Sequence, residues 1–264
     1  MTAAEPARLC VLGPSGRMGR AVIDAAAGRG DVRITAAVDR ADAPGLGHSV
    51  AGVVVGADLR AGLGAASVYV DFTTIASTLV AAQVARELGR AAVIGTTGLS
   101  PADEAQLDEL ARSQPIVVAS NFSLGVNLLT GLVRKAAQAL GPTWDVEVVE
   151  THHRAKRDAP SGTALTLAQA AAAGHGVAYD AVKRHGRDGE VGARPQGEIG
   201  VHAVRGGDVV GEHTVSLFGA GERLELSHRA TSRTIFAAGA LRAAAWVVGQ
   251  PPGRYDMLDV LGLR

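Results

Sequence analysis

The first 123 residues alternate between two hydrophobic patterns. Short apolar runs, typical of buried strands, are separated by stretches in which apolar residues recur at helical spacing. The runs predict strands at 8–12, 33–38, 68–72, 91–94 and 115–119, and the helical spacing predicts helices at 18–27, 77–88 and 101–113. Strands that alternate with helices through short connections are typical of a parallel sheet with helices on its faces.

The pattern changes at about residue 124. A long amphipathic helix, a strand and a second helix are predicted at 125–140, 145–151 and 164–173. Three strands follow at 199–204, 209–217 and 223–226, with a turn at 205–208 between the first two, and helical spacing returns at 234–247. The segment 174–198 is rich in Gly, Arg and Asp and is predicted to be a mobile loop. This region is therefore predicted to be α+β, with an open, largely antiparallel or mixed sheet.

Length and composition suit a chain of two domains and give no sign of binding to nucleic acid or a membrane. The 264 residues are 47% hydrophobic, enough for a core in each of two domains. The 26 basic and 26 acidic side chains balance, so no strong overall field favours nucleic acid or a membrane surface. No apolar run reaches the ~18–20 residues of a membrane span, and the N-terminus lacks a secretory signal pattern. The single cysteine, Cys10, lies in an apolar run and is predicted to be a buried free thiol in a soluble, cytoplasmic protein.

A glycine-rich segment, here called the glycine loop, follows the first predicted strand and opens the first predicted helix. It reads Gly13-Pro14-Ser15-Gly16-Arg17-Met18-Gly19. Glycines at such a junction allow a tight turn and let backbone N–H groups approach a pyrophosphate at the helix N-terminus. The spacing is G-x-x-G-x-x-G and not the common G-x-G-x-x-G, so an ordinary glycine-rich turn is the alternative interpretation.

Two charged residues, Asp39 and Arg40, stand at the end of the second predicted strand. They lie about twenty residues after the glycine loop, where a dinucleotide site places the acidic residue that binds the ribose hydroxyls. Arg40 can pair with a 2′-phosphate, and Arg17 is a second candidate for a phosphate contact. A solvated pair of loop residues is the alternative, but the combined spacing favours a dinucleotide site that accepts both NADH and NADPH.

Two segments of small polar residues follow later strands of the same region. They read Gly95-Thr96-Thr97-Gly98 and Ala119-Ser120-Asn121-Phe122-Ser123. Ligands of open α/β sheets gather at the carboxyl ends of the strands. Small residues there let a nicotinamide ring lie close to the backbone, although either segment alone is equally consistent with a simple turn.

A strongly basic stretch follows a predicted strand that ends at two histidines. It reads Glu150-Thr151-His152-His153-Arg154-Ala155-Lys156-Arg157-Asp158-Ala159-Pro160-Ser161-Gly162-Thr163-Ala164. Ser161 is predicted to be the N-cap of the next helix, so that the segment Ser161-Gly162-Thr163, here called the anion turn, points donors at an anion. A histidine and a lysine nearby can supply proton transfer and charge stabilisation. The stretch therefore predicts a carboxylate site beside an acid catalyst.

Other interpretations of this stretch exist. His152 and His153 can bind a metal, but a metal site needs further ligands, and the single cysteine and the absence of an H-x-x-x-H pattern argue against one. We therefore expect no metal. A capping loop with a solvated basic face is the second alternative.

The basic stretch closely resembles the signature E-x-H-H-x-x-K-x-D-A-P-S-G-T-A of the 4-hydroxy-tetrahydrodipicolinate reductase family. The resemblance extends over nearly the whole chain. Further segments in the family's order are the glycine loop, Asp71-Phe72-Thr73, Gly95-Thr96-Thr97-Gly98, Asn121-Phe122-Ser123-Leu124-Gly125-Val126-Asn127, Gly211-Glu212-His213-Thr214 and Asp256-Met257-Leu258-Asp259-Val260-Leu261.

The resemblance implies that NADPH or NADH reduces a cyclic imine dicarboxylate, with loss of water. It implies that His152 is a proton donor or acceptor and Lys156 a proton donor. His153 would contact the substrate, and Gly162 and Thr163 would hold a carboxylate. It also implies a Rossmann-type cofactor domain at 1–123 completed by 233–264, an inserted substrate domain at 124–232 whose sheet builds a homotetramer, and closure of one domain on the other.

Two rival functions fit parts of the pattern. Another NAD(P)-dependent two-domain dehydrogenase would share the dinucleotide site without needing the anion turn beside His152 and Lys156. A non-catalytic NADPH-sensing regulator would bind the cofactor without turnover, and it leaves the acid catalyst and anion turn unexplained.

Overall fold

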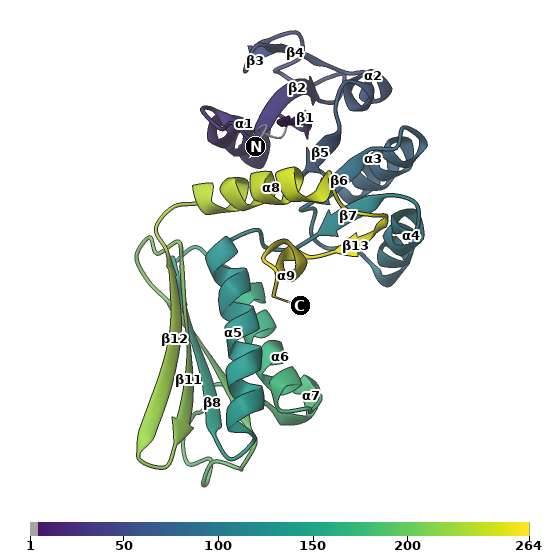
Figure 1. Ribbon diagram of the computed structural model, residues 1–264. Helices are drawn as coiled ribbons and strands as arrows, with labels where there is room; N and C mark the ends of the chain where they lie inside the picture. Colours follow the sequence, from purple (N-terminus) through teal and green to yellow (C-terminus); the bar gives the residue numbers. More distant parts are fainter. Residues whose placement is uncertain (1–4, 264) are drawn as a thin grey trace. The chain divides into compact units, whose positions relative to one another are not determined.

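Two sheets organise residues 5–263, which the computed structural model describes. The chain divides into two compact units, one containing the residues up to Leu124 together with those from Thr234 onward, the other spanning Gly125–Arg233 (Figure 1). Each unit has its own sheet and its own hydrophobic core.

The first unit is built on an eight-stranded sheet in the order β13-β7-β6-β5-β1-β2-β4-β3. All neighbouring pairs are parallel except β3 with β4. The strands are β1 Ala7–Leu12, β2 Val32–Val38, β3 Ser49–Val50, β4 Val53–Gly56, β5 Val68–Asp71, β6 Ala91–Ile94, β7 Pro115–Val118 and β13 Gly253–Tyr255. The helices are α1 Arg17–Ala26, α2 Leu59–Gly64, α3 Ile75–Glu87, α4 Pro101–Ala111, α8 Thr234–Val247 and α9 Met257–Val260. The predicted parallel sheet is confirmed.

Strand β1 shows why this sheet is buried on both faces. Leu9 and Val11 point into one core, and Cys10 and Leu12 point into the other. Side chains alternate along a strand, so an unbroken apolar run supplies both layers. Cys10 is a free, fully buried thiol, as predicted, and burial raises its pKa to about 12.

Helix α8, from the C-terminal part of the chain, completes the first core. It spans Thr234–Val247, the bounds expected from its hydrophobic spacing. Gly239 allows its close approach, since a Cβ there would lie 1.7 Å from the backbone oxygen of Phe122. Ala237, Ala240 and Leu241 are fully buried in the same core. The C-terminal segment is therefore an integral part of the first unit.

The second unit is built on a mixed five-stranded sheet in the order β12-β11-β8-β10-β9. Strand β8 lies parallel to β10 and antiparallel to β11. The elements are α5 Leu124–Leu140, β8 Asp145–His152, α6 Gly162–Gly174, α7 Tyr179–Val182, β9 Lys183–His185, β10 Ile199–Arg205, β11 Gly211–Gly219 and β12 Glu222–Ala230. Helices α5 and α6 cover one face of this sheet (Figure 1). The predicted mixed sheet is confirmed.

Two details of the second unit differ from the sequence-based expectation. The turn at 205–208 does not join paired strands, because β8 lies between β10 and β11. The segment 174–198, for which a mobile loop was predicted, contains α7 and β9. Arg187 and Arg194 also anchor it, with hydrogen bonds of 2.6 and 3.0 Å to Glu147.

Among residues 5–263, no helix of either unit is long and apolar enough to cross a membrane.

Candidate functional site

The glycine loop connects β1 to α1 at the carboxyl edge of the first sheet. Gly13 has φ of +65°, a conformation that strongly favours glycine, and its backbone N–H donates to Val38 at 2.9 Å. Gly16 is the N-cap of α1, and Arg17 and Met18 begin the helix. Because glycine has no side chain to cap the helix, the first-turn N–H groups are left for a ligand.

Gly19 shows how tightly this turn is closed. A Cβ at this position would lie 2.1 Å from the backbone oxygen of Gly13 and 2.8 Å from the Cα of Pro14. The first helical turn thus packs directly on the backbone of the loop, which only glycine permits. This close-packed turn with uncapped N–H groups fits a pyrophosphate, the central group of a dinucleotide.

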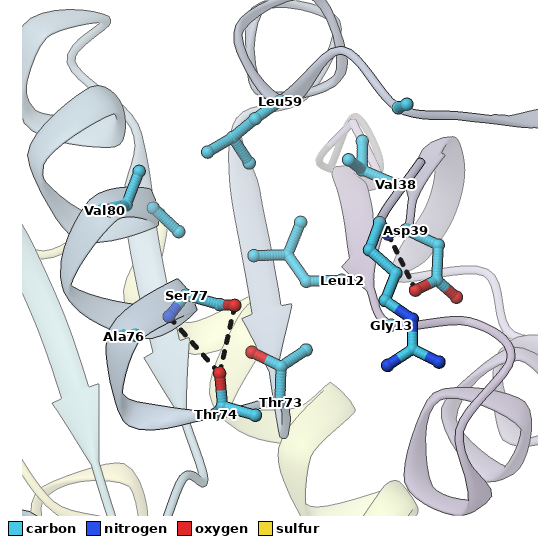
Figure 2. A pocket seen from close by; sticks show the side chains of 13 residues that line it. Leu12, Gly13, Val38, Asp39, Leu59, Thr73, Thr74, Ala76, Ser77 and Val80 are labelled. Carbon is cyan, nitrogen blue, oxygen red and sulfur yellow. Dashed lines mark hydrogen bonds between the residues drawn. The ribbon is translucent and has the colours of Figure 1, made fainter. Parts of the chain in front are cut away.

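Asp39 and Arg40 lie beside the glycine loop, at the end of β2. The Asp39 carboxylate accepts hydrogen bonds from the backbone N–H of Ser15 at 3.1 Å and of Arg40 at 2.9 Å. The Arg40 guanidinium is mostly exposed and pairs with Asp42 at 2.9 Å. Both residues line a pocket of about 500 Å³ together with Gly13, Thr73 and others (Figure 2). A dinucleotide's adenosine half fits this arrangement of an apolar pocket with a carboxylate and a guanidinium at its rim.

A second pocket of about 580 Å³ lies at the ends of β5 and β6 and is lined by Met18, Gly95, Thr96 and Thr97, among others. Its walls are fixed by the buried carboxylate of Asp71, which accepts from the hydroxyl groups of Thr73 at 2.6 Å and Thr78 at 2.8 Å. Thr78 in turn is 2.7 Å from the hydroxyl of Thr96. Burial raises the pKa of Asp71, and the threonine hydrogen bonds offset this only in part.

The segment after β7 was predicted to lie beside the nicotinamide, but it lines neither of the two pockets. Phe122 is 1% exposed, and its ring packs edge-on against Phe72 with the centroids 5.5 Å apart. Phe122 is therefore a core residue of the first unit. Ala119, Ser120 and Asn121 follow the end of β7 and line neither of the two pockets described above.

In the second unit, His152 ends β8 with its imidazole held by a buried carboxylate. Its Nδ1 lies 2.5 Å from Oε2 of Glu150, two residues earlier on the same face of the strand. The next residue, His153, is fixed through its backbone, whose N–H donates to Val209 at 2.8 Å. The two histidines therefore have separate environments. Across the described residues, no group of three or more His, Cys, Asp or Glu side chains is arranged to hold a metal ion.

The anion turn opens α6, and its first residue, Ser161, is 2% exposed, with its backbone N–H donating to Glu150 at 3.0 Å. Ser161 is the N-cap of α6, and its hydroxyl accepts from the backbone N–H of Ala164 at 3.1 Å. Gly162 is exposed and Thr163 partly exposed at the first turn of this helix. The N–H groups of a capped first turn and the positive end of the helix dipole suit a carboxylate. The prediction of a helix start at Ser161 is confirmed.

His213, on β11, supports the anion turn from the other side. Its Nε2 is 3.1 Å from the Ser161 hydroxyl, and its ring packs edge-on against His152 with the centroids 5.2 Å apart. Burial first, and then the neighbouring imidazole of His152, lower the pKa of His213 to about 4. His213 is therefore a neutral hydrogen-bonding partner at neutral pH.

Lys156 lies in the loop between β8 and α6. Its ammonium pairs with Asp158 at 2.7 Å, and its side chain is 19% exposed against 64% for Asp158. The pair is held at the loop by a hydrogen bond from the Lys156 N–H to the backbone oxygen of His153 at 3.1 Å. An incoming carboxylate can replace the exposed Asp158 as the partner of this ammonium.

Sequence reasoning assigned no role to four polar residues that the structure places around these sites. Glu150, Arg205 and His213 hold His152 and the anion turn, and Asp71 holds the second cofactor-side pocket. Three of them, Asp71, Glu150 and His213, stand within quoted segments of the sequence, and their burial and partners become visible only in the structure. A glutamate two residues before a strand-ending histidine was the one available signal, because side chains at i and i+2 share a face.

Comparison with known proteins identifies both halves of the chain. Residues 7–122 match the family model described as dihydrodipicolinate reductase, N-terminus, and residues 125–261 match the model of its C-terminus. The 4-hydroxy-tetrahydrodipicolinate reductase of Alkalilimnicola ehrlichii is 50% identical over 97% of this chain and 99% of its own. That of Roseobacter denitrificans is 47% identical over 98% of both.

A solved structure agrees with the sequence comparisons. The dipicolinate-bound dihydrodipicolinate reductase of Paenisporosarcina sp. superposes with a TM-score of 0.81 at 26% identity, covering 96% of this chain and 98% of that one. An amine dehydrogenase of Mycobacterium smegmatis shares the fold at a TM-score of 0.58 and 16% identity, over 94% of both chains.

Proposed function

Because the chain belongs to the dihydrodipicolinate reductase family, we propose that it reduces 4-hydroxy-tetrahydrodipicolinate to tetrahydrodipicolinate, with loss of water, in the diaminopimelate and lysine pathway. One observation supports this most strongly: an anion-binding helix start and an acid–base histidine share one buried carboxylate, Glu150. That arrangement suits a small dicarboxylate whose reduction requires a proton.

The reduced nicotinamide, when bound, supplies the hydride, and this chain supplies binding and protons. The anion turn, with Ser161 as its cap, binds one carboxylate through Gly162 and Thr163. His153 contacts the substrate at the end of β8. His152 exchanges the proton and Lys156 donates one, and the positive charge of Lys156 also stabilises negative charge that develops on the ring. The basic residues thus match a dianionic substrate.

The first unit provides the cofactor site. Gly13, Pro14, Ser15, Gly16, Arg17 and Met18 form the pyrophosphate turn, and Asp39 with Arg40 bind the adenosine ribose. Gly95, Thr96 and Thr97, with the segment Ala119-Ser120-Asn121-Phe122, flank the nicotinamide. The position of Asp39 beside the loop and of Arg40 at the pocket rim supports use of both NADH and NADPH.

Replacing Arg40 separates the two cofactors. Arg40→Ala should raise the KM for NADPH by about 10-fold and leave the KM for NADH nearly unchanged, because only NADPH offers a 2′-phosphate to the guanidinium. Steady-state kinetics with each cofactor measure this. Asp42→Ala is a matched control, since it removes the partner of Arg40 without removing the guanidinium. Equal increases for both cofactors in Arg40→Ala would rule out this role.

Assembly through the second sheet is also proposed, as a homotetramer in the cytoplasm. Helices α5 and α6 cover only one face of this sheet, and Val149, Val204 and Phe218 on its other face are 40%, 46% and 36% exposed. Exposed apolar side chains on a sheet face that no helix covers suit burial against a second copy. Light scattering at micromolar concentration should give the mass of four chains. A monomer under these conditions would refute the proposal.

The proposed reaction is tested by following NADPH absorbance with freshly prepared 4-hydroxy-tetrahydrodipicolinate. We expect cofactor oxidation that depends on this substrate and stops when it is exhausted. Oxidation with other imines or keto acids, but not with this substrate, would favour another dehydrogenase. Cofactor binding without turnover on any of them would favour a regulator.

A further inference from the structure

Glu150 occupies a position where the pattern of its strand calls for an apolar residue. It follows Val146 and Val148 on the face of β8 that turns toward the core, and like them it is 0% exposed. Burying a carboxylate is costly unless it is fully paired. The carboxylate of Glu150 therefore needs hydrogen-bond donors on both of its oxygens, and the second unit provides them.

The partners divide evenly between the two carboxylate oxygens. Oε1 accepts from the backbone N–H of Ser161 at 3.0 Å and from Arg205 at 2.8 Å. Oε2 lies 2.5 Å from Nδ1 of His152 and accepts from Arg205 at 2.8 Å. Burial alone would raise the pKa of Glu150, but the hydrogen bonds from Arg205, His152 and Ser161 together lower it.

An ionised carboxylate only accepts hydrogen bonds, so its partners must all donate. His152 therefore keeps its proton on Nδ1, which leaves Nε2 as the nitrogen that exchanges a proton. Gly211 on β11 keeps this nitrogen uncovered, because a Cβ there would lie 3.0 Å from it. The tautomer and the orientation of the imidazole thus follow from the contacts of Glu150 and Gly211.

We infer that Glu150 is a positioning residue that sets the Nδ1–H tautomer of His152 with one oxygen and holds the anion turn with the other. This inference rests on the proposed function, since it assigns to Nε2 of His152 the proton exchange with the substrate. Glu150 thereby fixes the distance between the group that binds one carboxylate and the group that moves the proton. Arg205 stabilises the carboxylate by its paired hydrogen bonds.

The test is Glu150→Gln, which changes charge and donor pattern but not shape. A glutamine has one oxygen for two sets of partners. The backbone N–H of Ser161 cannot become an acceptor, whereas an imidazole can, so the amide NH₂ will face His152. Nδ1 must then accept, and the proton moves to Nε2. Turnover should fall ~10²–10⁴-fold, as expected when a base is held in the wrong tautomer, while the KM for the dicarboxylate changes less than about 3-fold because the anion turn keeps its acceptor.

Nitrogen-15 NMR of histidine-labelled protein measures the tautomer directly. The chain has eight histidines, so the signal of His152 is assigned by its loss in His152→Gln. In the natural protein, at a pH where the ring is neutral, we expect the proton on Nδ1 and none on Nε2. In Glu150→Gln we expect the proton on Nε2 and none on Nδ1. An unprotonated Nδ1 in the neutral ring of His152 in the natural protein would overturn the inference, even if the variant did not fold.

Glu147→Gln is the matched control. Glu147 lies on the same strand, and it also binds an arginine and a histidine, with Arg187 at 2.6 Å and His202 at 2.7 Å. It faces the other side of the sheet, so its loss should leave turnover and the His152 signals unchanged. Equal losses of turnover in the two variants would reduce Glu150 to a structural role. If the natural protein does not reduce the substrate at all, the proposed function fails, and the NMR result still decides the tautomer.

Discussion

Replacing His152 with alanine should lower turnover ~10²–10⁴-fold while leaving the dissociation constant of NADPH nearly unchanged. A general acid or base acts in the transition state, so its loss reduces the rate of the chemical step. His152 and its partners Glu150 and His213 all lie in the second unit, whereas the glycine loop, Asp39 and Arg40 lie in the first. Steady-state kinetics measure turnover, and NADPH fluorescence measures the dissociation constant separately.

Lys156→Ala should behave in the same way, because it removes a proton donor and a positive charge beside the substrate. Thr163→Val, by contrast, should chiefly raise the KM for the dicarboxylate, since it removes a hydroxyl that binds a carboxylate. Lys135→Ala is the matched control, an exposed lysine on α5 of the same unit. Near-normal turnover in both His152→Ala and Lys156→Ala would show that the proton-transfer groups lie elsewhere. Loss of NADPH binding in these variants would assign the loop to the cofactor site.

The second large effect is expected at Gly19. A Cβ at Gly19 would lie 2.1 Å from the backbone oxygen of Gly13, and a backbone contact cannot be relieved by rotating a side chain. Gly19→Ala must therefore shift the glycine loop away from the first turn of α1, the site that we propose for the pyrophosphate. Overpacking of this kind costs about 1–3 kcal/mol or more, so the dissociation constant of NADPH should rise about 100-fold.

Gly30→Ala controls for the general effect of a glycine replacement next to α1. A Cβ at Gly30 would meet no atom within 4 Å, and the residue is exposed. NADPH titrations of both variants, with a thermal midpoint for each, separate loss of binding from loss of folding. A folded Gly19→Ala protein with normal NADPH affinity would show that the glycine loop does not hold the pyrophosphate.

Features that depend on nearby residues could be predicted from the sequence. Ser161 was identified as an N-cap because a short polar side chain before an Ala- and Leu-rich stretch competes well for the first N–H groups of a helix. Both ends of α8 were placed correctly, since its hydrophobic spacing begins and ends within one segment. The fold class followed in the same way, from strands and helices that each carry their own pattern.

Features that depend on distant pairing could not be predicted. The turn at 205–208 contains glycines and looks like a hairpin, yet β8 lies between the strands that it joins. Hydrophobic alternation sets which face of a strand is buried, but it does not set which strand is the neighbour. The order of the loop 174–198 likewise depends on Arg187 and Arg194 meeting acidic residues that lie 40 or more positions earlier.

The two buried carboxylates were missed for a related reason. Asp71 ends the apolar strand β5 and binds Thr78 on α3, whereas Glu150 lies within β8 and binds Arg205 on β10. A charged residue within a motif is as consistent with an exposed contact as with a buried one until those partners are known. Their importance for the geometry of the two sites therefore becomes visible only in the folded chain.

The central claim is that this chain moves a hydride from NADPH to a dicarboxylate ring with a proton supplied through His152. It is tested most directly by incubating the protein with 4-hydroxy-tetrahydrodipicolinate and NADPH that carries deuterium at both positions of nicotinamide C4. We predict that mass spectrometry will find tetrahydrodipicolinate with one deuterium bound to a ring carbon, formed much more slowly by His152→Ala. Product without deuterium, or no product from the natural protein while NADPH still binds, would contradict the account.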